Sequence, residues 1–141
     1  MKNIRILITT LLVAAVSVSV HAQQRQLLTV TVPFAFTAEN SSLPAGTYTV
    51  STLPPYNMIK VQSADGQKVA MIPAIPSPTS AESERTKLVF DRIGNQYFLS
   101  QVWEQGSNLR RDLRSGKLAQ ELVSGGWRVQ STTVLASNGA H

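Results

Sequence analysis

Most catalytic sites and transition-metal sites depend on His or Cys side chains, and this chain of 141 residues offers almost none. It has no Cys, and its two His residues are His21 and His141. A Ser-His-Asp or Cys-His arrangement therefore lacks its base in the body of the chain. Zinc and copper lack their preferred ligands for the same reason. We expect no metal site, no cofactor and no catalytic residue.

Paired carboxylates are the remaining route to catalysis, because two of them can hydrolyse a glycosidic bond. Glu82 and Glu84 lie in a polar segment, whereas Asp91 and Glu104 lie near a predicted hairpin. Acidic side chains of this kind are usually solvated surface groups. A hydrolase is therefore ranked third among the functions, after a structural or interaction role and ligand binding. We predict that the protein is not an enzyme.

Two sets of side chains could bind a ligand without catalysis. Exposed aromatic rings could stack against sugars, and the candidates are Trp103, Trp127, Tyr56 and Tyr97. A basic cluster could bind an acidic polymer or lipopolysaccharide, and its members are Arg110, Arg111, Arg114 and Lys117. The alternatives are that the rings pack in the core and that the charges lie on a solvated connection.

The first 22 residues have the pattern of a secretory signal peptide. Lys2 and Arg5 precede an apolar run that ends in the small-residue site Val20-His21-Ala22. A membrane anchor is the alternative, but a span needs about 20 strongly apolar residues, and this run is shorter and weaker. We predict cleavage after Ala22 and a secreted or periplasmic protein.

Residues 23–141 are predicted to form one domain, large enough to bury a core without disulfides. Removal of Lys2 and Arg5 lowers the formal net charge from +5 to +3. Specific nucleic-acid binding needs a denser basic stripe than this. The partner therefore stays open, with an envelope glycan or another envelope protein as the possibilities.

Residues 30–50 set the first part of the fold. Apolar and polar side chains alternate before and after a turn at residues 43–46, which predicts two strands. Pro44 and Gly46 occupy turn positions that favour them, and Tyr48 follows at the spacing of a tyrosine corner. The alternative is an ordinary turn followed by a half-buried Tyr48. Pro33 has no N–H, so the first strand should lie at an edge or carry a bulge.

A second hairpin is predicted around Asp65-Gly66, which joins residues 58–63 to residues 67–73. Asp-Gly favours a type I′ turn, in which both central residues have positive φ. The predicted cross-strand pairs are Val61 with Ala70 and Ile59 with Ile72. These four residues should form the apolar face, and Lys60, Gln62, Val69 and Met71 the half-solvated one.

A third hairpin joins residues 86–92 to residues 96–103 through Gly94-Asn95, in a type II′ or I′ turn. The predicted cross-strand pairs are Phe90 with Leu99, Arg92 with Tyr97 and Leu88 with Gln101. The predicted core face holds Leu88, Phe90, Tyr97, Leu99 and Trp103. The opposite face holds Val89, Phe98 and Val102 and should be partly buried as well.

The remaining segments are less regular. Residues 73–85 are rich in Pro and Ser and are predicted to be a mobile loop. Residues 105–114 should be a polar connection, and residues 117–123 a short helix with Leu118 and Leu122 on one stripe. Residues 127–136 should be a closing strand. Together these elements predict an all-β fold, either a sandwich or a partly closed barrel of about seven antiparallel strands with one short helix.

The chain contains three motifs, VPFAF at residues 32–36, LPAGTY at 43–48 and LVFDRIGNQYFLSQVW at 88–103. They resemble a large group of small secreted bacterial proteins of unknown function, across residues 32 to about 122. In that group a Ser and a Glu precede the short helix. The segment LRSGKLAQEL departs from that pattern, with Gly116 ahead of the helix and Glu121 late. The resemblance implies export and a β fold, and no reaction.

We therefore expect a secreted, non-catalytic β module with a structural or interaction role in the cell envelope or extracellular space. The alternative is a protein that binds carbohydrate or an acidic polymer through exposed aromatic rings or the basic cluster. An exposed pair of Trp rings would favour the first ligand, and a continuous Arg face the second.

Overall fold

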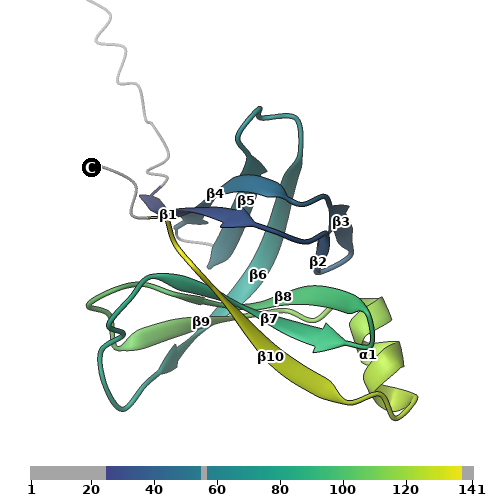
Figure 1. Ribbon diagram of the computed structural model, residues 1–141. Helices are drawn as coiled ribbons and strands as arrows, with labels where there is room; N and C mark the ends of the chain where they lie inside the picture. The colour runs from purple at the N-terminus through teal and green to yellow at the C-terminus, as the bar shows by residue number, and fades with distance from the viewer. Residues whose placement is uncertain (1–24, 55–56, 138–141) are drawn as a thin grey trace, which may run out of the picture.

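The computed structural model describes residues 25–54 and 57–137, which form ten strands and one helix (Figure 1). The strands are β1 (Arg25–Val32), β2 (Phe36–Ala38), β3 (Ser41–Leu43), β4 (Gly46–Leu53), β5 (Met58–Ser63), β6 (Val69–Pro78), β7 (Lys87–Ile93), β8 (Gln96–Trp103), β9 (Leu109–Leu113) and β10 (Val129–Leu135). The helix is α1 (Lys117–Ser124). The predicted signal peptide, Tyr56 and His141 lie outside the described residues.

The strands curl into a partly closed barrel, which confirms the predicted all-β fold with one short helix. Antiparallel pairing runs from β1 through β4, β5, β6, β9, β8 and β7 to β10. Strand β6 pairs first with β5 and then with β9, so it joins the two layers seen in Figure 1. One backbone hydrogen bond spans the gap between β1 and the residues after β10, from the Ser137 N–H to the Thr29 carbonyl at 2.9 Å. The short contact between β2 and β8 is parallel, an exception to the antiparallel prediction.

The tyrosine corner is confirmed. The Tyr48 hydroxyl donates to the Pro44 carbonyl at 2.5 Å, and the side chain is only 1% exposed. Burial raises the pKa of Tyr48 above its ordinary value, and the nearby charge of Asp65 acts in the same direction. Strand β1 lies at a sheet edge as predicted, but it ends before Pro33, and β2 begins a new pairing at Phe36.

The Asp65-Gly66 hairpin has the predicted register, and its apolar face is buried. The predicted turn type is wrong, because only Gly66 has a positive φ, at 76°. The loop is longer than two residues, since the Ser63 N–H donates to the Lys68 carbonyl. Asp65 instead accepts hydrogen bonds from the Ser63 hydroxyl and the Gln67 N–H, and the first of these contributes most to lowering its pKa.

The Gly94 hairpin departs from the predicted register at Ser100, which is an extra residue in β8. Phe90 lies opposite Leu99 as predicted, but Val89 rather than Leu88 lies opposite Gln101. The Ser100 hydroxyl donates to the Val89 carbonyl at 3.0 Å and so occupies the bulge. One inserted residue exchanges the two faces beyond it. Val102 is therefore buried in the core, and the prediction that Trp103 lies on the core face is wrong.

The predicted loop at residues 73–85 is wrong in its first half, because β6 continues to Pro78. Successive N–H groups of a strand point to opposite sides. The Ala74 N–H donates to Asn57 on the β5 side, and the Thr79 N–H donates to Asn108 on the β9 side. The backbone nitrogens of Pro76 and Pro78 point to the same side of β6 as that of Ala74. At these positions β6 extends past β5, and no described strand pairs with it on that side. Their missing N–H groups therefore remove no hydrogen bond.

The predicted polar connection at residues 105–114 is also wrong, since it contains strand β9. This strand lies between β6 and β8. Leu113 packs in the core, so Arg111 shares the inward-facing side of β9 with it, and Arg110 lies on the other side. Three consecutive charged residues, from Arg110 to Asp112, hide the strand pattern in the sequence.

Helix α1 covers the outer face of the β7–β8 hairpin. Ala119 and Leu122 pack against Ile93 and Phe98, rather than the predicted stripe of Leu118 and Leu122. Gly116 is required at its start, because a Cβ there would lie 1.8 Å from the Glu39 carbonyl oxygen. The Lys117 N–H is capped at 3.0 Å by the Oδ1 atom of Asn40 in the β2–β3 turn.

Candidate functional site

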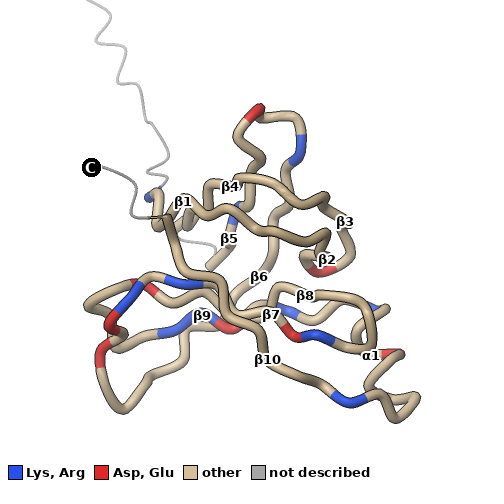
Figure 2. The backbone as a smooth tube through the Cα atoms, viewed as in Figure 1, with Lys and Arg blue, Asp and Glu red and all other residues tan. Residues whose placement is uncertain are grey.

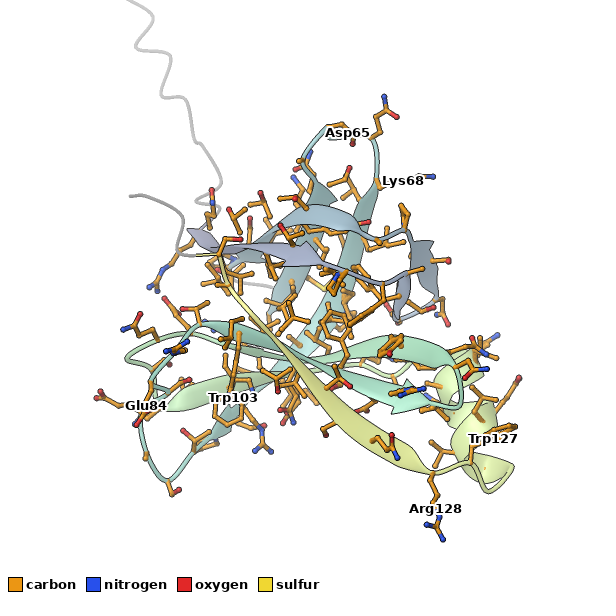
Figure 3. The ribbon with its side chains drawn as sticks, in the orientation of Figure 1. Asp65, Lys68, Glu84, Trp103, Trp127 and Arg128 are labelled. Carbon is orange, nitrogen blue, oxygen red and sulfur yellow. The ribbon has the colours of Figure 1, made fainter. Side chains whose placement is uncertain are left out.

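The strongest candidate site is an open cleft beside Trp127, which we call the Trp127 cleft. It has a volume of about 640 Å³, and its lining residues are Arg92, Gly94, Gly125, Gly126, Trp127, Arg128 and Gln130. Trp127 is 57% exposed, which is unusual for the largest apolar side chain. Figure 3 shows Trp127 and Arg128 together at the end of the molecule that carries α1.

The helix end and a hairpin turn hold Trp127 in place. The Gly126 N–H donates to the Val123 carbonyl, and the Trp127 N–H donates to the Leu122 carbonyl. Gly126 has a φ of 89°, a conformation that favours glycine. The indole ring lies over Gly94, where a Cβ would be 3.3 Å from ring atom Cζ3. The ring is therefore fixed on one side by glycine backbone and open to solvent on the other.

Two arginines give the Trp127 cleft a positive charge. The Arg92 Nε–H donates to the Gly94 carbonyl at 3.2 Å, and the guanidinium lies 5.8 Å from the centre of the Tyr97 ring. Gln130 lies directly opposite Arg92 in the β7–β10 pairing. Within the described part of the chain, neither Arg92 nor Arg128 forms an ion pair. Both charges are therefore available to an anionic ligand.

Trp103, the other predicted platform residue, lies at the opposite end of the same hairpin. It pairs with Lys87 at the open end, whereas Gly94 forms the turn. Its ring contacts two cations, Lys87 Nζ at 4.8 Å and Arg110 at 5.9 Å, and its Nε1–H donates to Gln101. Figure 3 shows the two Trp side chains well apart. They do not form a shared platform.

The predicted basic cluster is divided among several surroundings. Arg110 pairs with Asp112 at 2.9 Å, while Arg111 faces inward, 3.8 Å from Glu104. Arg114 and Lys117 are exposed beyond the end of β9. Figure 2 shows Lys and Arg positions interspersed with Asp and Glu positions along this part of the backbone. The cluster therefore forms no continuous Arg face.

The candidate acids are also separated. Asp91 lies opposite Phe98 within the hairpin, whereas Glu104 follows Trp103 and bonds to Arg25. Burial raises the pKa of Asp91, and the nearby Ser100 side chain opposes that shift. Residues 25–54 and 57–137 contain no group of three or more His, Cys, Asp or Glu side chains that could hold a metal ion. In the same residues, no helix has the length and apolar character needed to cross a membrane.

Sequence reasoning selected Trp127 but missed its neighbours Arg92, Arg128 and Gln130. Arg92 meets Trp127 and Gln130 only because β10 pairs with β7, a long-range contact that no local pattern indicates. Arg128 follows Trp127 directly in the chain. The available signal was the segment Gly125-Gly126-Trp127-Arg128, in which a helix stop delivers an aromatic ring and a cation together.

Comparisons with models of known protein families, with curated proteins and with solved structures find no match to this chain.

Proposed function

We propose that the protein is a non-catalytic interaction module of the cell envelope or extracellular space, and that it binds an acidic polysaccharide in the Trp127 cleft. The observation that carries the proposal is the exposed Trp127 ring, which lies on glycine backbone in a cleft with two arginines that form no ion pair with any described residue. The sequence suggests two kinds of binding site, an aromatic platform for sugars and a basic site for an acidic polymer. The Trp127 cleft has features of both.

The chemistry of the cleft suits a sugar that carries a carboxylate. A flat indole face packs against the C–H groups of a pyranose ring and excludes water from them. A guanidinium can donate two parallel hydrogen bonds to a carboxylate, which gives direction as well as charge. Arg92 and Arg128 supply the guanidinium groups, and the Gln130 amide can bond a hydroxyl. The cleft is open rather than enclosed, so a polymer can pass along it.

The location in this proposal rests on the amino-terminal sequence and on the family resemblance. Residues 1–22 have the charge, apolar and small-residue pattern of a signal peptide. The resembling proteins are secreted. An exported protein meets the acidic glycans of the cell surface and matrix, which are ligands of the required charge.

A titration with a short oligogalacturonate tests the proposal, with its methyl ester as a matched uncharged ligand. We expect saturable binding of the acid form, weaker binding of the ester, and a loss of affinity as salt is raised. Arg128→Gln should weaken binding, whereas Arg114→Gln, at an exposed arginine elsewhere, should not. Equal binding of acid and ester, or no binding of either, would show that the cleft does not recognise acidic sugars.

A further inference from the structure

A second cavity, of about 260 Å³, lies between β4, β5, β6 and β9. It shares no lining residue with the Trp127 cleft. Its wall is mainly apolar, and the apolar residues include Leu53, Met58, Ile59, Ala74, Pro76 and Leu109. An apolar cavity of about 150 Å³ in a protein interior can already hold an organic molecule the size of benzene. This cavity is large enough for a small apolar ligand.

Arg111 also lines this cavity, from the inward-facing side of β9. Its side chain is only 21% exposed. Its Nη1 atom is buried and has no hydrogen-bond partner among the described residues. A buried donor without a partner is costly, and such donors are rare in folded proteins. A ligand that accepts a hydrogen bond from this guanidinium would remove that cost.

The charges around Arg111 favour an anion. Glu104 places Oε1 2.5 Å from Arg25 and Oε2 3.8 Å from the Nη1 atom of Arg111, which is too long for a hydrogen bond. One carboxylate is thus shared by two guanidinium groups, and the closer contact is to Arg25. Asp112, the next residue along β9, bonds instead to Ser77 and Arg110 on the other face. Arg25, Arg111 and Glu104 together carry a net charge of +1, and no other described acid forms an ion pair with these two arginines.

We propose that this cavity binds an amphiphilic monocarboxylate, with its chain against the apolar wall and its carboxylate on Arg111. The volume corresponds to about nine non-hydrogen atoms at the ~30 Å³ that a water molecule occupies in the liquid. A medium-chain carboxylate such as octanoate matches that size. Pockets for small ligands are mostly apolar, with few polar groups that fix the orientation of the ligand.

The experiment titrates the purified protein with octanoate, and with octanol and octylammonium as ligands of the same chain and different head group. Methyl NMR spectra report the chain, through the shifts of Leu53, Ile59 and Ala74. We expect octanoate to shift these methyl signals saturably, octanol to bind at least about tenfold more weakly, and octylammonium not to bind. Equal affinity for octanoate and octanol, or no shift of these methyl signals with octanoate, would overturn the proposal.

Two neighbouring substitutions separate the carboxylate contact from a general charge effect. Arg111→Met should weaken octanoate binding at least about tenfold and leave octanol binding unchanged. Arg110→Met, in the same strand but on the other face, should change neither. If Arg111→Met fails to fold, Arg111→Lys keeps the charge and should retain part of the preference for octanoate. Equal effects at both arginines, or an unchanged preference in the variant that folds, would contradict the assigned contact.

Discussion

Two groups of aromatic rings differ in what surrounds them, one inside the barrel and one on its surface. Inside, Tyr97, Phe34, Phe90, Phe36 and Tyr48 contact one another in a continuous series. On the surface, Trp127 contacts glycine backbone and is 57% exposed. Arg92 lies between the groups, since it contacts the Tyr97 ring and also lines the Trp127 cleft.

The inner rings therefore stabilise the fold, whereas Trp127 is available to bind a ligand. The inner rings come from strands in both layers of the barrel and from the β1–β2 connection, which carries Phe34. They exclude water between them, so the fold depends on them. Trp127 buries little surface in the folded chain, so the fold has little to lose there. A substitution in each group should therefore change a different measurement.

The largest effect is expected for Tyr48→Ala, which removes a ring in edge contact with Phe36 at 5.2 Å. Loss of a buried aromatic side chain should lower the free energy of unfolding by roughly 3–5 kcal/mol. Urea melts of the variant beside the parent measure this loss. A loss below about 1 kcal/mol would mean that the inner rings do not hold the layers together.

Gly66→Val tests the turn beside the inner group, where the Ala64 N–H donates to the Thr47 carbonyl. The φ of 76° at Gly66 is strained for a β-branched residue and should cost on the order of 1–3 kcal/mol. Gly66→Asn is the matched control, since Asn tolerates positive φ better than Val does. Thermal melts should rank the parent first, the Asn variant second and the Val variant last, and equal melting of the two variants would contradict the turn.

Tyr48→Phe measures how much of the stability of the inner group comes from one hydrogen bond, because it keeps the ring and removes only the bond to Pro44. The carbonyl left behind is partly desolvated, so we expect a loss of about 1–2 kcal/mol. Chemical denaturation together with an unchanged circular dichroism spectrum would measure it. A variant as stable as the parent would show that the corner bond contributes nothing.

The smallest effect on stability is expected for Trp127→Ala, at the surface. Substitutions of exposed residues usually change the free energy of unfolding by less than about 0.5 kcal/mol. The same denaturation measurement applies. A loss as large as that of Tyr48→Ala would place Trp127 with the inner rings and would remove the distinction drawn above.

The parts of the fold that follow local patterns could be predicted from the sequence. Tyr48 stands at a fixed spacing from Pro44, and the pairing of Val61 with Ala70 follows from the Asp65-Gly66 turn. The helix at residues 117–124 follows from its glycine stop. In each of these cases the determining residues lie close together in the chain.

Other parts depend on partners that are distant in sequence. The bulge at Ser100 exchanges the faces of Val102 and Trp103, and no residue beside it signals the insertion. Pro76 is tolerated in β6 only because β5 has already ended. Arg92 meets Trp127 only because β10 returns to pair with β7. The candidate site was therefore predicted as one ring without its charged neighbours.

Binding of oligogalacturonate by Trp127→Ala, compared with Trp103→Ala, tests the central claim most directly. Both substitutions remove an indole ring, one that lies over the Gly94 turn of the β7–β8 hairpin and one at its open end, and only the first lies in the cleft. We predict that Trp127→Ala weakens binding about fivefold or more, since stacking of one ring contributes about 1 kcal/mol or more. Trp103→Ala should bind like the parent. Equal binding by all three proteins, or a greater loss with Trp103→Ala, would contradict the assignment of the Trp127 cleft.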